Sequence, residues 1–219
     1  RRNKKQIDEA EILESVEKVL LGPERKSRVI TEKDKKMTAY HEAGHAVVGH
    51  MMAHCDPVRK VSIISRGQAG GYTLKMPSED RHYHTLAQFK DELAMTMGGF
   101  VVEKMIFGDV MISTGPSSDL KSATHIAKDM VTRYGMSAKL GARTFGVQEE
   151  LIFLGREIHE QQDYSDKTAE EIDREISAFI AEAEKRAKEV LEKNRDKMDK
   201  LVEKLKKLKE GRKAEARLV

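Results

Sequence analysis

Along most of the chain, apolar residues recur every three or four positions, which is the spacing of helices that bury one face. Gly-Pro and Asp-Pro pairs and isolated glycines separate these periodic segments and mark where each helix ends. Residues 136–164 are expected to form irregular connections and one shorter helix. The pattern predicts helices over residues 7–21, 31 to about 55, 85–107 (interrupted at Gly98-Gly99) and 118–135, and one long helix or two from Ser165.

Residues 58–76 follow a different pattern. β-Branched residues gather in VRKVSIIS (58–65), and YTLKM (72–76) follows after a Gly-rich turn. Two such segments favour a β-hairpin. Aromatic residues make up only 5% of the chain and prolines number 4, so an all-β sandwich is disfavoured. The expected fold is mainly α-helical with one small β-sheet or hairpin.

Charge and composition narrow the possible functions. The 40 Lys and Arg residues nearly offset the 37 Asp and Glu residues, and the two signs are interspersed, so no nucleic-acid partner is expected. No apolar run approaches 18 residues and no GxxxxGK[ST] motif is present, so a soluble chain without a membrane span or a P-loop is expected. The single cysteine, Cys55, fits a reducing compartment.

The sequence HEAGH at residues 41–45 has the H-E-x-x-H pattern. On a helix at about 100° per residue, His41 and His45 lie one turn apart and only about 40° apart in direction, so both imidazoles can reach one point. Glu42 then lies beside that point, where a carboxylate can act as a general base on water. The pattern therefore predicts a zinc-binding helix that supports metal-assisted hydrolysis.

A third metal ligand is needed, and spacing alone leaves its identity open. Glu103 lies in a downstream helix, and Asp119 lies at a loop-to-helix junction. On the zinc helix itself, His50, His54 and Cys55 project away from the His41–His45 point or lie too far along the axis. The remaining histidines are expected to be surface or structural residues: His82, His84, His125 and His159.

Several further segments accompany HEAGH in a fixed order, and together they carry a resemblance over Arg1 to about Leu201. The chain resembles the protease domain of FtsH, the family of membrane-anchored AAA+ zinc metalloproteases. The segments are RRNKK (1–5), GPERKSRVI (22–30), AYHEAGHAVV (39–48), VSIISRGQAGGYT (61–73), GG…E (98–103), STGPSSDL (113–120), MVTRYGMSAKLG (130–141) and YSDKTAEEID (164–173).

The resemblance implies a complete zinc site, with one zinc ion per chain. His41, His45 and Asp119 match the family's zinc ligands, and Glu42 matches its catalytic base. Glu103 then becomes a supporting carboxylate. The matching β-edge, within residues 61–74, would pair with extended substrate backbone.

The resemblance also implies parts that precede this chain. Residues 1–21 would be the end of an ATPase module or a linker helix, 22–208 the zinc protease domain with long C-terminal helices, and 209–219 a disordered tail. ATP would act only in the missing module, and any membrane contact would come from segments absent here. The parent protein is expected to be a membrane-anchored homohexamer with this domain in a reducing compartment: cytoplasm, or the matrix or stroma of an organelle.

The leading hypothesis is the protease module of an ATP-dependent zinc endopeptidase that acts on unfolded or extracted membrane and soluble proteins. The alternative is a zinc-stabilised module that assembles a hexamer and cuts nothing. The intact Glu42 argues against the alternative, because a purely structural zinc site has no use for a general base. A basic nucleic-acid binder is a third and weaker hypothesis.

Overall fold

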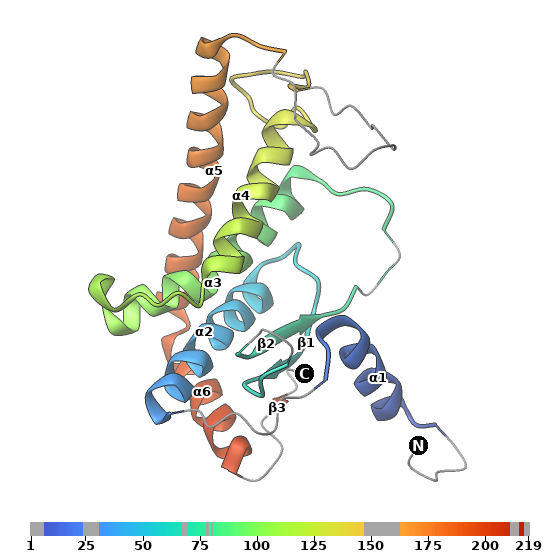
Figure 1. Ribbon diagram of the computed structural model, residues 1–219, viewed down its shortest axis with the longest axis vertical. Helices are drawn as coiled ribbons and strands as arrows, with labels where there is room; N and C mark the ends of the chain where they lie inside the picture. The colour runs from blue at the N-terminus through green and yellow to red at the C-terminus, as the bar shows by residue number, and fades with distance from the viewer. Residues whose placement is uncertain are drawn as a thin grey trace, which may run out of the picture.

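The computed structural model describes residues 7–23, 31–66, 70–77, 79, 81–146, 163–210 and 215–216. These residues are mainly helical with one small sheet, which confirms the expected fold class (Figure 1). The helices are α1 (Glu9–Leu21), α2 (Glu32–Met51), α3 (Leu86–Phe107), the short 3-10 helix η1 (Asp109–Met111), α4 (Ser117–Thr132), α5 (Asp166–Lys193) and α6 (Arg195–Glu210); the strands are β1 (Val58–Ser62), β2 (Tyr72–Lys75) and β3 (Glu215–Ala216).

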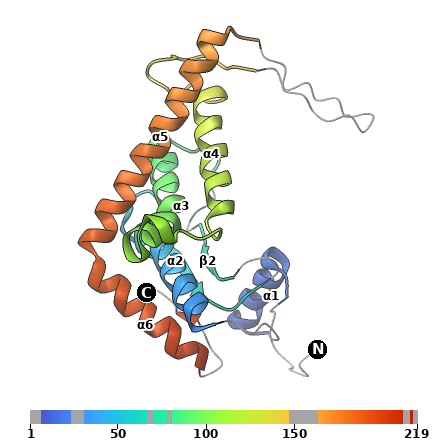
Figure 2. The ribbon, with the colours of Figure 1, turned by 60° about the vertical axis from the view of Figure 1, so that its left-hand side comes forward.

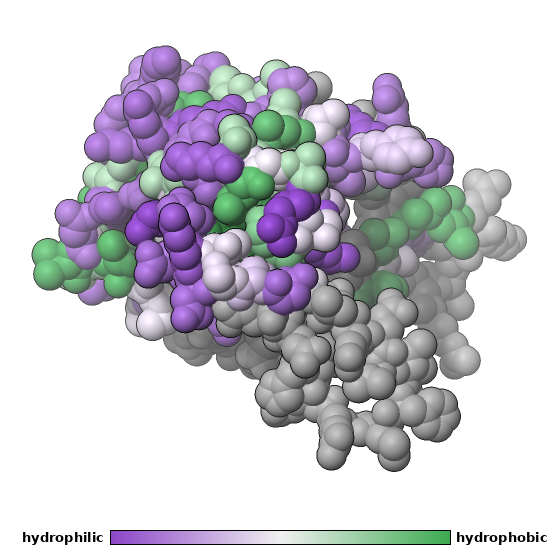
Figure 3. Space-filling view, turned by 90° about the horizontal axis from the view of Figure 1, so that it is seen from above, coloured by the Kyte–Doolittle hydropathy of each residue, from purple (hydrophilic) through white to green (hydrophobic). Residues whose placement is uncertain are grey.

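Helix α2 lies at the centre and packs against α3, α5, α6 and β1. Figures 1 and 2 show α5 descending beside α4 through the upper part of the molecule, after which the chain bends into α6, which continues downward and packs against α2. Seen along that length, the surface is mostly hydrophilic (Figure 3). The core between the helices is apolar. Burying one large apolar side chain completely stabilises the folded state by about 1.5–3 kcal/mol relative to leaving it exposed. The largest members of the core include Leu93, Met97, Met130, Leu191, Met198 and Leu205.

Helices α2 and α3 cross in backbone contact at Gly44 and Gly98. A Cβ atom on Gly98 would lie 2.8 Å from the carbonyl oxygen of Gly44, and one on Gly44 would lie even closer to the carbonyl of Gly98. The predicted interruption of the third helix at Gly98-Gly99 is wrong, because α3 continues without a break through both glycines. Packing against α2 outweighs the weak helix propensity of glycine, which is about 1 kcal/mol per residue relative to alanine.

Helix α2 ends at Met51, about four residues before the end that the sequence predicts. The buried carboxylate of Asp91, on α3, accepts hydrogen bonds from the backbone N–H and ring Nδ1 of His54 at 3.0 and 2.9 Å, and it pairs with Arg186 of α5. The His54 amide is therefore bound to Asp91 rather than to a helical carbonyl, and the chain turns toward β1.

The C-terminal helical pattern forms two helices rather than one. The backbone of Asn194 leaves the helical region between α5 and α6, and its side-chain amide donates to the carbonyl of Val190 at 2.9 Å. Among the described residues of 136–164, those at 136–146 form turns, and 147–162 lie outside the description. The shorter helix expected there is therefore not located.

The predicted hairpin is confirmed, and the three-stranded sheet has the order β2-β1-β3. Strands β1 and β2 are antiparallel, with Val61 opposite Thr73 and Ser62 opposite Tyr72. Strand β3, from the stretch expected to be a tail, pairs antiparallel with the other edge of β1. No helix in the described part of the chain has the length and apolarity needed to cross a bilayer.

Helix α1 is attached to the hairpin through one buried carboxylate. Glu17 is 1% exposed and accepts hydrogen bonds from Lys60 Nζ at 2.7 Å, from Arg66 Nη2 at 3.2 Å and from the Tyr72 hydroxyl at 3.0 Å. A buried carboxylate needs such partners, since an uncompensated one is strongly unfavourable. The cluster therefore fixes α1 against the outer face of the hairpin.

The crossing can be tested with Gly44→Ala, using Gly49→Ala on the same helix as the matched control. The new methyl group at position 44 would clash with the backbone carbonyl of Gly98. This overpacking should destabilise the fold by about 3 kcal/mol, which exceeds the stabilisation of about 1 kcal/mol from the higher helix propensity of alanine. We expect a loss of about 2 kcal/mol in the free energy of unfolding, measured in urea. At Gly49 the added methyl group would face the flexible Met95 side chain, which can move aside. The free energy of unfolding of Gly49→Ala should therefore be close to that of the unmodified chain. Equal unfolding midpoints for the two variants would contradict a close backbone contact between α2 and α3 at Gly44.

Candidate metal centre

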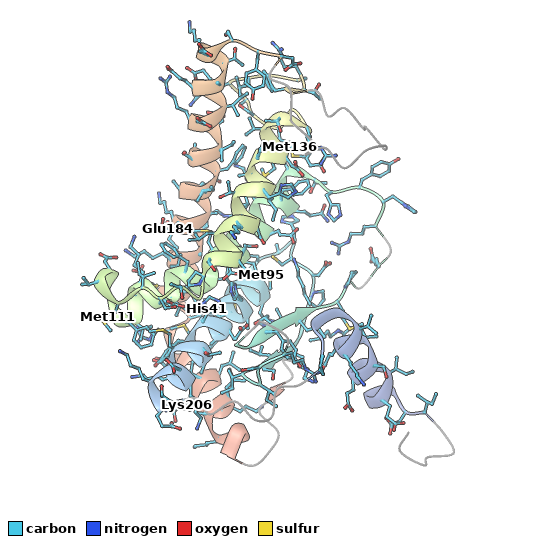
Figure 4. All side chains as sticks on the ribbon, in the orientation of Figure 1. His41, Met95, Met111, Met136, Glu184 and Lys206 are labelled. Atoms are coloured by element: carbon cyan, nitrogen blue, oxygen red, sulfur yellow. The ribbon has the colours of Figure 1, made fainter. Side chains whose placement is uncertain are left out.

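The two HEAGH histidines and Asp119 converge on one point. His41 and His45 lie on α2, and Asp119 lies in the first turn of α4. The two Nε2 atoms are 3.1 Å apart, and Asp119 Oδ2 lies 3.1 Å from His41 Nε2 and 3.3 Å from His45 Nε2. Figure 4 shows His41 at the centre of the molecule, where α2 faces α3 and the start of α4.

The other ring nitrogens of both histidines are already bound. His45 Nδ1 donates to the carbonyl oxygen of Met95 at 2.8 Å, and His41 Nδ1 lies 2.9 Å from Glu103 Oε1. Because both partners are acceptors, the ring protons belong on Nδ1, and each Nε2 directs a lone pair at the shared point. When both imidazoles are neutral, Asp119 Oδ2 is buried there with no hydrogen to accept among the described residues, and only a protonated Nε2 would donate one.

This donor set fits a zinc ion. In a tetrahedral site with ligands at about 2.0–2.1 Å from Zn²⁺, two ligand atoms are about 3.3 Å apart. The three separations of 3.1, 3.1 and 3.3 Å match the edges of such a site. Two neutral imidazoles and one carboxylate leave a fourth position open, as in catalytic rather than structural zinc sites.

The electrostatics also favour a positive charge at this point. Burial opposes protonation of His41, but hydrogen bonds to the carboxylates of Asp119 and Glu103 outweigh it and raise the pKa of His41 to about 10. Burial likewise opposes ionisation of Asp119, yet hydrogen bonds to His41 and His45 hold the pKa of its carboxyl well below the usual range. The carboxylates of Asp119 and Glu103 therefore favour a positive charge at the imidazoles, which either a proton or a metal ion can supply.

Glu103 lies behind the ligands and connects two parts of the site. Its side chain is almost fully buried; Oε1 faces His41 Nδ1, and Oε2 accepts the backbone N–H of Ser113 at 2.9 Å. Burial raises the pKa of this carboxyl, but the hydrogen bonds from His41 and Ser113 outweigh it and lower the pKa overall. Of the two candidates that spacing leaves open, Asp119 therefore lies with the imidazole Nε2 atoms, and Glu103 orients His41 and the loop that leads to α4.

Gly99 provides the space in which the two imidazoles lie. A Cβ atom at this position would be 2.6 Å from His45 Nε2 and 2.7 Å from His41 Nε2. Any side chain on α3 here would occupy the point where the donor atoms meet. The second glycine of the Gly98-Gly99 pair thus serves the site, and the first serves the helix crossing.

Glu42 lies next to this group and is held in a buried position. Its side chain is 6% exposed, and burial raises its pKa above the ordinary value. The Thr73 hydroxyl, on β2, is 2.9 Å from Glu42 Oε2 and 3.1 Å from the Glu42 carbonyl oxygen. A carboxylate with a raised pKa beside a metal site can accept a proton from water and release it again.

The other candidates lie apart from this point. His50, His82, His84 and His125 are exposed, and His159 lies outside the described residues. Cys55 is partly buried, which raises the pKa of its thiol to about 12. Sequence reasoning did not single out Thr73 or the Met95 carbonyl. A backbone carbonyl leaves no signal in a sequence, whereas Thr73 could have been proposed from its place in the strand edge.

Comparison with known proteins agrees with this geometry. A family model described as "Peptidase family M41" matches residues 28–214. The chain is 54% identical over 199 residues to "ATP-dependent zinc metalloprotease FtsH 1" of Sphaerobacter thermophilus, covering 91% of this chain and 30% of the relative. It is 53% identical over 201 residues to "ATP-dependent zinc metalloprotease FtsH" of Caldicellulosiruptor bescii, covering 92% of this chain and 32% of the relative.

The chain thus spans about a third of the length of these relatives, and the match covers almost all of the chain itself. The family match includes α2, the hairpin and the start of α4, which carry the candidate metal ligands and Glu42. The chain belongs to peptidase family M41 and is a protease domain of the FtsH zinc metalloproteases.

Proposed function

We propose that this chain is the protease module of an ATP-dependent zinc endopeptidase that hydrolyses peptide bonds of unfolded or extracted membrane and soluble proteins. The observation that carries the proposal is the convergence of His41, His45 and Asp119 beside the buried Glu42. A binding module needs the three donor atoms alone, whereas hydrolysis also needs the general base.

His41, His45 and Asp119 would hold one zinc ion. When bound, zinc polarises the scissile carbonyl and lowers the pKa of water toward about 7. Glu42 takes one proton from the attacking water as the oxygen adds to the carbonyl carbon. The same proton then passes to the amide nitrogen as the C–N bond breaks, and Glu42 returns to its starting state.

Strand β2 offers the edge on which an extended substrate can pair. Strand β1 is flanked by β2 and β3, so within the described sheet the outer edge of β2 has no partner strand. Thr73 of β2 contacts Glu42, so a substrate strand on this edge would lie next to the base. Pairing through backbone groups tolerates many side-chain sequences, which suits a protease with broad specificity.

The rest of the activity belongs to segments outside this chain. The names of the relatives state ATP dependence, and this chain spans only about a third of their length. Following the family resemblance, we assign threading of substrates by ATP hydrolysis, a homohexameric ring and a membrane anchor to the parent protein. This module supplies the cleavage step.

Metal binding tests the ligand assignment. The purified chain should bind one zinc ion, measured by elemental analysis and competition with a chromogenic chelator. Asp119→Asn should lose stoichiometric zinc binding, because the substitution removes a charged ligand. Glu103→Gln should weaken zinc affinity by only about 10–100-fold, because Glu103 orients the ligand His41 and does not bind the ion itself. His125→Ala, an exposed residue on α4, is the control. Equal zinc affinity in Asp119→Asn and the unmodified chain would refute the assignment of Asp119.

Cleavage of a labelled unfolded polypeptide tests the role of Glu42. Glu42→Gln should retain zinc and lower the cleavage rate by at least about 10²–10⁴-fold, because the amide cannot accept the proton from water. Glu189→Gln, exposed on α5, should cleave normally. If neither the unmodified chain nor Glu42→Gln cleaves while both bind zinc, the proposal that this module carries the cleavage step is wrong, and the assembly-module alternative is favoured.

A further inference from the structure

The hydroxyl of Thr73 makes the closest described polar contact of the Glu42 carboxylate. Its Oγ1 atom lies 2.9 Å from Glu42 Oε2 and 3.1 Å from the carbonyl oxygen of the same residue. These two oxygens are at opposite ends of the glutamate, one on the side chain and one on the helix backbone. Both therefore face a single hydroxyl group on a neighbouring element.

A threonine hydroxyl has one hydrogen to donate, so only one of the two oxygens can receive it at a time. In a helix, the carbonyl of Glu42 accepts the amide four residues later. The ionised carboxylate is the stronger acceptor, since hydrogen bonds to charged groups are shorter and stronger. While Glu42 is ionised, the Thr73 hydroxyl therefore directs its hydrogen to Oε2, and this hydrogen bond fixes the direction of the carboxylate.

Thr73 is itself held rigidly on two sides. It lies opposite Val61 in the β1–β2 ladder, and its neighbour Tyr72 donates to the buried Glu17 of α1 at 3.0 Å. Beside it, a Cβ atom on Gly71 would lie 2.8 Å from Glu42 Cγ, so the strand backbone closes on the glutamate side chain. The strand is therefore held by β1 and α1 in addition to its contacts with α2, and it can act as a fixed support for a side chain of α2.

We propose that Thr73 is a positioning residue for the general base, an inference that rests on the proposed endopeptidase function. Glutamate has three rotatable side-chain bonds, and the Thr73 hydroxyl holds its carboxylate in the direction of the attacking water. When Glu42 takes up the proton, the hydroxyl can turn to the Glu42 carbonyl oxygen. Thr73 neither loses nor gains a proton, so its contribution is geometric.

Thr73→Val removes the hydroxyl and keeps the size and branching of the side chain, and Thr73→Ser restores the hydroxyl. Thr132→Val is the matched control: Thr132 is buried on α4, and its hydroxyl donates to a backbone carbonyl, that of Lys128, at 2.9 Å. The kcat and KM of the full chain are measured on an internally quenched peptide. The zinc content and the melting temperature of each variant are measured in parallel.

We expect Thr73→Val to lower kcat by about 10- to 100-fold, the equivalent of one hydrogen bond to a charged group. KM and zinc content should stay unchanged, because the substrate-pairing backbone and the metal ligands are untouched. The melting temperature of Thr73→Val should match that of Thr132→Val, and the kcat of Thr73→Ser should lie within about threefold of the unmodified chain. An unchanged kcat in Thr73→Val, an equal loss in Thr73→Ser, or loss of zinc would each overturn the proposal.

Crystal structures of the variants supply a readout that needs no activity. The Glu42 carboxylate should occupy more than one position in Thr73→Val and a single position in Thr73→Ser. A single unchanged position in Thr73→Val would overturn the proposal. Failure of the unmodified chain to cleave would count against the endopeptidase function, and the crystallographic comparison would still decide the role of Thr73.

Discussion

The backbone contact between α2 and α3 at Gly44 and Gly98 sets the geometry of everything around it. Only at this separation can α3 offer its groups to both histidines of α2: the Met95 carbonyl to His45 and the Glu103 carboxylate to His41. Gly99, one residue beyond the crossing, leaves the space in which the imidazoles meet. A wider crossing would leave both Nδ1–H groups without acceptors, and the direction of each ring would be lost.

Around this crossing, each functional group is held by an element other than its own. Glu103 binds the amide of Ser113 and so fixes the loop from which α4 and Asp119 follow. Thr73 of β2 contacts Glu42 of α2, and β2 is in turn held by Glu17 of α1. The site is thus an intersection of four elements, and long side chains such as glutamate are restrained from outside their own helix.

The sequence was sufficient for the parts of this arrangement that depend on local patterns. Periodicity located the main helices and the hairpin, and the spacing of HEAGH put two imidazoles on one face of a helix. It could not choose between Glu103 and Asp119, because that choice depends on how α3 and α4 pack against α2. The sequence also predicted an interruption of the helix at Gly98-Gly99 that the structure does not have. Low helix propensity is a local property, whereas the compensating contact with α2 depends on how the helices pack. The early end of α2 has the same cause, a hydrogen bond from His54 to Asp91, a residue 37 positions away in sequence.

The division of the candidate ligands between two helices has a consequence for the fold itself. His41 and His45 belong to α2, whereas Asp119 begins α4, and within the described residues the chain between them includes the whole hairpin and α3. An ion held by all three would act as a cross-link that closes this long loop, in the manner of a disulfide. Its binding free energy would then also be folding free energy, since the unfolded chain has no preformed site. The ion proposed to serve hydrolysis would thus also hold the first turn of α4 at the centre of the domain.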